Sequence, residues 1–467
     1  MAKNVATDKE DASSLLARNF ASTRYADIPQ EIRERVKMSI LDTLGVSIAA
    51  SSLAPGCREL ADLAKEGAGR RESTILVFGE RVPAWMAAFV NGGMAHGLDF
   101  DDVHHEGLSH PSGAVVPAAF AIAERVGATN GQDFITAIAL GHDMVMRMLS
   151  SLHWDIKLLF NWLRFPVVAV FGAAATCGKL LGFNEDKIQA AIGTALCYSA
   201  GAGQLRYSNV RGLYDSWAAQ GAVMAALMAE KGIAGPTHPL EGDTGFFNVY
   251  FRGEYDRNIL LADLGRKFFG TYIGYKAWPS CAATQPSINA TLDLVQQHDL
   301  DPEDIDEIAV SVGAHTVVNC EPLEYMRKPK TILEAKFSVP FTVALAATRR
   351  RVTLTDFTQE SINDTAILAL TQRVATKLDA QLNASRGLDG SIVDIKTKTG
   401  KKYSQRTDCV YGHYRNPMNM EAIIAKFKDC ASYSAKPLSA KNLEKTVATV
   451  LKLEEVNDAG EIIRLLS

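Results

Sequence analysis

Apolar residues recur at helical spacing over the first half of the chain. Between about residues 14 and 265 they stand three and four apart, as in the series Ile32, Val36, Ile40, Leu44 and Ile48. This spacing predicts amphipathic helices. Segments such as VFGAAATCGKLLG and WAAQGAVMAALMAEKG are rich in small residues, which let helices approach closely, so we expect a buried helical bundle.

The pattern changes after Lys276. EIAVSVGA from Glu307 and SIVDIKTKTG from Ser391 alternate apolar and polar residues, and Thr399-Gly400-Lys401 has the composition of a hairpin turn, so strands are predicted here. After Asn416, MEAIIAKFKDCA and LEKTVATVLKLEEV return to helical spacing.

These patterns predict a mainly α fold with an α+β part. A large all-helical domain is expected from residues 1–268 and 403–467, and a smaller inserted α+β domain from residues 269–402. Two domains also suit a chain of 467 residues, which is too long for one hydrophobic core.

The composition of the chain argues against nucleic acid and membranes as binding partners. The formal net charge is only −4, so there is no basic excess of the kind that binds nucleic acid. Apolar runs such as AVVPAAFAIA are shorter than the roughly 20 residues that span a bilayer, and no membrane segment is expected. The seven cysteines form no CxxC pair, and the first residues resemble neither a signal nor a transit peptide, so a cytoplasmic location is predicted.

The densest polar cluster is HGLDFDDVHHEGLSHPSG, residues 96–113, with three aspartates, four histidines and a glutamate. A carboxylate such as Asp99 can take a proton while His110 gives or relays one. Histidine and aspartate also bind metals, but the spacing matches neither HExxH nor a facial triad, and we predict no metal. Helix capping is the ordinary role of any one aspartate, so at most two of Asp99, Asp101 and Asp102 are expected to be chemical.

Two further segments carry groups that suit an anionic substrate. In YKAWPSCAATQPS, Lys276 can bind a carboxylate beside Ser280 and Cys281, or it can be an ordinary surface charge. In GQLRYSNVRGLYDS, Arg206 and Arg211 can bind carboxylates with two hydrogen bonds, or they can bridge helix ends. Nucleotide-binding signatures are missing, so no nucleotide cofactor is expected.

The stretch NGGMAHGLDFDDVHH followed by HPSGAVVPA resembles the signature of the MmgE/PrpD family, which includes 2-methylcitrate dehydratase, cis-aconitate decarboxylase and iminodisuccinate epimerase. FGAAATCGKLLG, KAWPSCAATQPSINA, EAKFSVPFTVALA and YGHYRNPMNMEAIIAKFKDCA extend the resemblance over nearly the whole chain.

The resemblance implies a helical domain formed by both ends of the chain, an α+β lid domain, a homodimer, and an active site between the domains. It also implies catalysis without metal or organic cofactor. Asp99, His110 and Lys276 fall on catalytic positions of the family. Contacts with a small di- or tricarboxylate are predicted for His104, Arg206, Arg211, Ser280 and Cys281.

Several positions depart from the family pattern. Leu163 or its neighbours stand where dehydratases carry the histidine of a WHP motif, and Arg211 stands where a catalytic lysine is usual. The decarboxylase tyrosine and histidine align with Phe341 and Cys281, and a threonine common after DFDD aligns with Val103. Decarboxylation of cis-aconitate is therefore not expected. Arg211 is expected to bind a carboxylate rather than transfer protons, since its pKa exceeds about 12.

The leading hypothesis is a lyase that eliminates water from a hydroxylated di- or tricarboxylate similar to 2-methylcitrate. One alternative is an epimerase or isomerase of a dicarboxylate such as iminodisuccinate, which needs the same proton abstraction but no acid for a leaving group. A second alternative is a binding member of the family that has lost activity.

Overall fold

A computed structural model describes residues 10–67, 69–153, 161–384 and 387–467. The chain divides into two compact units. Unit 1 comprises Met1–His104, Ser109–Ile273 and Asn419–Ser467, and unit 2 comprises His105–Leu108 and Gly274–Met418. The mainly helical fold with an α+β part that the sequence predicts is confirmed.

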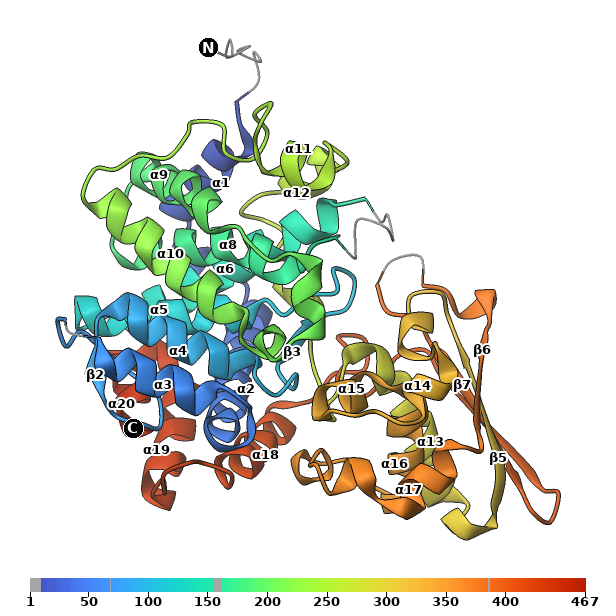
Figure 1. Cartoon of the computed structure of the whole chain (residues 1–467). Helices are drawn as coiled ribbons and strands as arrows, with labels where there is room; N and C mark the ends of the chain where they lie inside the picture. Colours follow the sequence, from blue (N-terminus) through green and yellow to red (C-terminus); the bar gives the residue numbers. More distant parts are fainter. Residues whose placement is uncertain (1–9, 68, 154–160, 385–386) are drawn as a thin grey trace. The chain divides into compact units, whose positions relative to one another are not determined.

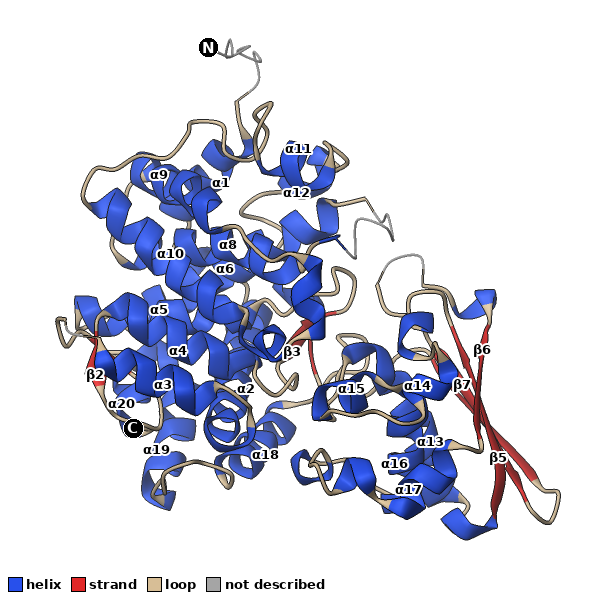
Figure 2. Cartoon of the chain, viewed as in Figure 1, coloured by secondary structure: helices blue, strands red, loops and turns tan. Residues whose placement is uncertain are grey.

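Unit 1 is built of helices, as Figure 2 shows. Their bounds are α1 (Ala12–Ser22), α2 (Gln30–Leu53), α3 (Cys57–Glu66), α4 (Ala84–His96), α5 (Ser112–Val126), α6 (Gly131–Ser151), α8 (Arg164–Leu180), α9 (Glu185–Ala195), α10 (Asp215–Glu230), α11 (Phe246–Phe251), α12 (Arg257–Leu261), α18 (Met420–Ala431), α19 (Ala440–Leu451) and α20 (Glu461–Leu465). Short strands β1 (Ser73–Thr74) and β2 (Arg81–Val82) pair antiparallel. A further short strand, β3, is Asp102–His104.

Small residues set the helix contacts of unit 1, as their pattern predicts. Helix α10 packs on α4 and α8, and α5 packs on α4, α6 and α8. Helices α6 and α8 lie close together where Gly141 faces Gly172, because a Cβ atom on Gly172 would lie 2.7 Å from the Gly141 carbonyl oxygen. Larger side chains would force these helices apart.

Helix α2 is long and apolar enough to cross a membrane by length and composition, a property that the sequence analysis overlooked. However, 89% of its most apolar 18-residue window is buried inside the structure. It packs against α4 and against α18 from the far end of the sequence (Figure 1). Core helices of globular proteins pass the same length test, so this finding is weak evidence for a membrane span.

Unit 2 combines a four-stranded sheet with helices. The strands β5 (Ile305–Val312), β6 (Val374–Leu378), β7 (Ser391–Thr397) and β8 (Lys402–Thr407) lie in the order β6-β5-β7-β8. Strand β5 is parallel to β6 and antiparallel to β7, which pairs antiparallel with β8. The helices are α13 (Gln285–Gln297), α14 (Leu323–Met326), α15 (Ile332–Phe337), α16 (Val339–Arg349) and α17 (Thr365–Thr371).

One face of this sheet is covered by α13 and α16 (Figure 2). Alternate residues of β7 are buried, including Val393 and Ile395, which belong to the same apolar core as Phe341 of α16. This alternation is typical of a sheet with one face against a core. The predicted turn between β7 and β8 is present, and Gly400 adopts there a φ of +87°, which glycine tolerates best.

The point at which the chain leaves unit 2 and returns to unit 1 lies later in the sequence than predicted. The predicted boundary after residue 402 would separate β8 from β7, with which β8 pairs along its length. The chain returns to unit 1 at Asn419 instead. Short alternating segments such as β8 carry weak signals, so the end of a sheet is hard to place from sequence.

Candidate functional site

The polar cluster of residues 96–113 connects α4 to α5. His96 is the last residue of α4, and its carbonyl oxygen accepts a hydrogen bond of 2.8 Å from the backbone N–H of Asp99. Asp99 has a φ of +53°, a left-handed conformation that aspartate tolerates better than most residues. This tight turn brings the aspartates back over the end of α4.

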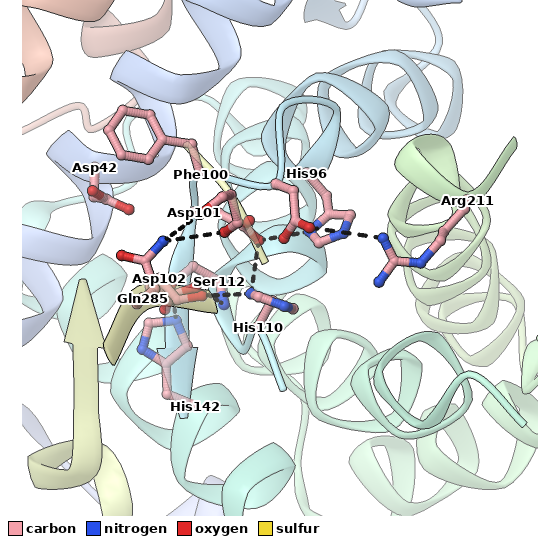
Figure 3. Close-up of polar contacts among 12 residues, drawn as sticks. Asp42, His96, Phe100, Asp101, Asp102, His110, Ser112, His142, Arg211 and Gln285 are labelled. Carbon is pink, nitrogen blue, oxygen red and sulfur yellow. Dashed lines mark hydrogen bonds and ion pairs between the residues drawn. The ribbon is translucent and has the colours of Figure 1, made fainter. Parts of the chain in front are cut away.

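Two histidines of the cluster share one carboxylate (Figure 3). Asp101 Oδ2 lies 2.9 Å from His96 Nδ1 and 3.4 Å from His110 Nδ1. His110 Nδ1 also lies 2.6 Å from the carbonyl oxygen of Asp102. Because a carbonyl oxygen only accepts, His110 Nδ1 carries a proton, and Nε2 is the nitrogen that can exchange a proton with a substrate.

The surrounding carboxylates favour the protonated form of His96. Burial by itself would lower the pKa of His96, but the carboxylates of Asp101, Asp99 and Asp215 together hold this pKa above its ordinary value. Asp101 therefore bridges His96 and the candidate acid/base group His110.

Asp102 has a structural role. Its carboxyl accepts hydrogen bonds from the Ser112 hydroxyl at 2.6 Å and from the Ser112 backbone N–H at 3.3 Å. The same hydroxyl lies 3.1 Å from His142 Nε2 on α6. Burial, reinforced by the charge of Asp101, raises the pKa of Asp102 well above its ordinary value, and burial lowers the pKa of His142 to about 3. Asp102, Ser112 and His142 together link the start of α5 to α6.

Lys426 anchors the segment that carries the aspartates. This residue of α18 donates a hydrogen bond of 2.7 Å to the carbonyl oxygen of Phe100 and lies 2.7 Å from Asp42 of α2. Its ammonium group also stands 3.8 Å from the centre of the Phe100 ring. The C-terminal part of the chain thus holds the turn between Asp99 and Asp101 in place.

Asp99 faces the guanidinium of Arg211, which belongs to the short 3-10 helix Asn209–Leu213. Arg211 Nη1 lies 3.7 Å from Asp99 Oδ2, and both side chains are buried. The separation is that of an ion pair and is too long for a hydrogen bond. A neighbouring cation favours the ionised form of a carboxylate, which can accept a proton, while the guanidinium suits a substrate carboxylate.

Aromatic rings surround the two histidines. The ring of His96 lies between those of His110 and Tyr214, with centroids 4.7 and 4.6 Å away. Phe165 of α8 contacts His110 at 4.9 Å and stacks on Tyr214 at 5.7 Å. Apolar walls of this kind strengthen the interactions among the charged groups that they enclose.

Two overlapping groups of residues could hold a cation. His96, Asp99 and His110, and likewise His96, Asp101 and Asp215, have donor atoms within 4.8 Å of one another. Tetrahedral ligands at about 2.1 Å from zinc lie roughly 3.4 Å apart. Because His96 and Asp101 already form a direct hydrogen bond, we interpret these groups as hydrogen-bonded clusters rather than metal ligands.

Two further predicted substrate contacts, His104 and Arg206, belong to unit 1. The ring of His104 is fully buried, and neither nitrogen has a hydrogen-bond partner among the residues that the structure describes. Burial lowers the pKa of His104 to about 3, so the ring is neutral. Arg206 lies near Arg164, whose pKa is lowered to about 9 by burial and by the charge of Arg206. The binding roles of His104 and Arg206 stay predictions.

The remaining predicted residues belong to unit 2. Lys276 follows strand β4 (Ile273–Tyr275) and is buried. The Ser280 hydroxyl is 2.9 Å from that of Thr284 and accepts a hydrogen bond of 3.0 Å from Gln285 Nε2, so it stabilises the start of α13. The backbone N–H of Cys281 donates to the Lys336 carbonyl oxygen at 3.0 Å. Roles for Lys276, Ser280 and Cys281 in catalysis or binding stay predictions.

Family models match most of the chain. The MmgE/PrpD N-terminal domain matches residues 14–258, and the MmgE/PrpD C-terminal domain matches residues 278–452. The chain belongs to the MmgE/PrpD family. The resemblance inferred from the sequence motifs is thereby confirmed.

Curated relatives are similar over almost their whole lengths. The human cis-aconitate decarboxylase is 26% identical over 459 residues, which cover 95% of this chain and 92% of the relative. The mouse cis-aconitate decarboxylase is 27% identical, with 93% and 89% covered. The Aspergillus terreus enzyme of the same name is 22% identical, with 94% and 93% covered. These relatives support the prediction that the chain is an enzyme.

At three of its departures from the MmgE/PrpD pattern, this chain has buried apolar side chains. Leu163 precedes α8 and lies in the core of unit 1, and Val103 is buried in β3. Phe341 belongs to the core of unit 2. None of these side chains can transfer a proton, and His110 and the carboxylates around it stay the candidate acid/base groups of unit 1.

Sequence reasoning missed Tyr214 and Asp215 in this MmgE/PrpD chain, although both lie inside the segment that it selected for Arg211. An aspartate in the first turn of a helix is common and gives no functional signal. Only the packing of α10 on α4 and α5 shows that Asp215 lies beside His96.

Proposed function

We propose that this protein is a lyase that eliminates water from a hydroxylated di- or tricarboxylate similar to 2-methylcitrate, by acid/base catalysis without a cofactor. The observation that carries the proposal is the pairing of two buried groups of opposite function. Asp99 is a carboxylate beside a guanidinium, and His110 is an imidazole held at Nδ1 by the carbonyl of Asp102 and the carboxylate of Asp101.

In the proposed reaction, Asp99 removes the proton from the carbon next to a substrate carboxylate. Negative charge then grows on that carboxylate, and Arg211 stabilises it electrostatically. Protonated His110 gives its Nε2 proton to the leaving hydroxyl as the C–O bond breaks, and water departs. The products are an enoate and water, while Asp99 has gained a proton and His110 has lost one. Lys276 is proposed to stabilise the same developing negative charge together with Arg211.

The position of Asp101 favours proton donation from His110 to the substrate. His110 must be cationic to act as an acid, and a carboxylate 3.4 Å from Nδ1 favours the cation. The rate should therefore need ionised Asp99 and protonated His110, which gives a bell-shaped pH profile. We further propose that the enzyme is a cytoplasmic homodimer, on the basis of the family resemblance and the composition.

Decarboxylation is the second candidate, because the relatives matched over nearly the whole chain are named cis-aconitate decarboxylases. It would break a C–C bond, release carbon dioxide and need an acid to protonate the resulting carbanion. Buried Phe341, at the position aligned with the decarboxylase tyrosine, disfavours it. An epimerase is the third candidate, because proton abstraction and return need no acid for a leaving group.

One panel of substrates separates these reactions. Purified protein is incubated, with and without EDTA, with citrate-like hydroxy acids, their unsaturated products including cis-aconitate, and iminodisuccinate. Absorbance of the enoate, carbon dioxide release, and ¹H NMR in heavy water are recorded. We expect enoate formation that EDTA does not change.

Variants assign the roles in that assay. Asp99→Asn and His110→Gln should each lower kcat by about 10²–10⁴. Asp356→Asn serves as a matched control, because Asp356 is a buried carboxylate that caps a turn in unit 2. Carbon dioxide release would establish the decarboxylase, and deuterium exchange or inversion without an enoate would establish the epimerase. If no compound of the panel reacts and Asp99→Asn does not change the affinity for a ligand, the results would favour a binding role.

A further inference from the structure

Asp215, the first residue of α10, is buried where ionisation of its carboxyl is energetically unfavourable. It is fully buried, and neither carboxyl oxygen has a hydrogen-bond partner among the described residues. A Cβ atom on Gly113 would lie 2.0 Å from Asp215 Oδ2, so the carboxyl packs directly on the backbone at the start of α5. Buried carboxylates without partners are rare, and each needs an explanation.

His96 and Asp101 are titratable groups close to this carboxyl. One donor atom from each of His96, Asp101 and Asp215 lies within 4.8 Å of the others. Nε2 of His96 is buried and has no hydrogen-bond partner in the described part of the chain. One water molecule or a small rotation of a side chain can link groups at such a distance.

A series of neighbouring groups therefore runs from α10 to the candidate acid. Asp215 neighbours His96, His96 Nδ1 is bonded to Asp101 Oδ2, and the same oxygen faces His110 Nδ1. We propose that Asp215 is a positioning residue that stores a proton in the buried chain Asp215–His96–Asp101–His110 and thereby sets the pH at which His110 releases its proton.

The electrostatics agree with this geometry. Burial raises the pKa of Asp215 to about 7, against the opposing charge of His96 and with a further contribution from Asp101. The carboxyl thus changes charge near neutral pH, where acid/base catalysis operates. Asp215 interacts with the charged groups His96 from α4 and Asp101 from the turn after it, with Tyr214 from the segment before α10, and packs on uncharged Gly113 of α5. Around these groups, Asp99 acts on His96 and Tyr214, Arg211 acts on Tyr214, and apolar Phe165 of α8 stacks on Tyr214.

Asp215→Asn tests the proposal, because an amide of the same shape cannot ionise. Above neutral pH the variant has one negative charge fewer near the histidines, and this loss lowers the pKa of each histidine. His110 should lose its proton at a pH lower by about one unit. The titration is followed by NMR on protein labelled with ¹³C at the histidine Cε1 atoms, and His110→Gln assigns the signal among the ten histidines.

This titration does not require turnover, so it can be interpreted even if the proposed lyase activity fails. Where activity is measured, the inference rests on the proposed function, and the alkaline limb of the kcat profile should move to lower pH by the same amount. Asp143→Asn is the matched control. Asp143 is a buried carboxylate of unit 1 that pairs with Arg147 at 2.6 Å, and its loss should destabilise the protein without moving the His110 titration.

A double variant tests the route through His96. His96→Asn retains a polar group toward Asp101 but cannot carry a charge. In the His96→Asn background, Asp215→Asn should shift the His110 titration by less than half of the shift that it causes when His96 is present. An undiminished shift would show that Asp215 acts only through its direct field and would overturn the chain. An unshifted titration in folded Asp215→Asn would overturn the proposal altogether.

Discussion

The charge of Asp215 should make the folded protein less stable as the pH rises, and Asp215→Asn should remove this effect. The pKa of this carboxyl is raised from an ordinary 3.8 to about 7 by burial. Between these values the folded state keeps a proton that the unfolded state releases. The stabilisation is fully present below about pH 4 and is lost as the pH rises through about 7.

The size of the effect follows from linkage. For the two pKa values given, the free energy of unfolding contributed by Asp215 falls by about 3 kcal/mol between pH 5 and pH 8.5. Asparagine cannot ionise, so the stability of the variant relative to the native protein should improve by that amount over this range. For a unit of about 300 residues, this corresponds to roughly 4 °C in Tm.

Thermal unfolding of both proteins at pH 5 and pH 8.5 measures this difference, because effects of the amide that do not depend on pH cancel. Asp389→Asn is an informative control in unit 2. Burial alone would raise the pKa of Asp389, but hydrogen bonds from His315 and Ala384 hold it below its ordinary value. The titration window of Asp389 itself therefore lies below about pH 4. Between pH 5 and pH 8.5 the deficit of this variant should change only through the charge of its partner His315. An equal effect of Asp215→Asn at pH 5 and pH 8.5 would refute the reasoning.

Three more substitutions have defined outcomes. Asp101→Asn should move the alkaline limb of the kcat profile to lower pH, because the cation of His110 loses the carboxylate at 3.4 Å; an unchanged limb would exclude this role. Ser112→Ala removes a hydroxyl shared by Asp102 and His142 and should cost about 1–3 kcal/mol in urea unfolding; a loss below 0.5 kcal/mol would contradict it. Arg211→Lys should raise KM about tenfold with a smaller change in kcat, because a lysine binds a carboxylate as a point charge; a larger fall in kcat than rise in KM would contradict a binding role.

Local patterns in the sequence were enough to predict several elements of the fold. The spacing of Ile32, Val36 and Ile40 corresponds to the buried side of α2, and MEAIIAKFKDCA forms α18. Alternation in SIVDIKTKTG corresponds to β7. These periodicities follow from the geometry of a single helix or strand, so they can be read without knowing its neighbours. Strand β8 was assigned to the wrong side of a boundary because its membership depends on pairing with β7.

The same distinction applies to the site. Asp99 and His110 stand close in the sequence, and the motif that contains them identified the family as well as the candidate acid and base. The sequence could not assign separate roles to the three aspartates, because those roles follow from contacts. Asp99 faces Arg211, Asp101 bridges two histidines, and Asp102 bonds to Ser112.

Tertiary structure alone decided the position of Asp215. More than a hundred residues separate it from His96, and only the packing of α10 against α4 and α5 brings the two together. Whether an aspartate is a solvated helix terminus or a buried proton store depends on how much water and which charges surround it. Those quantities belong to the packed interior, and a one-dimensional pattern of residues does not contain them.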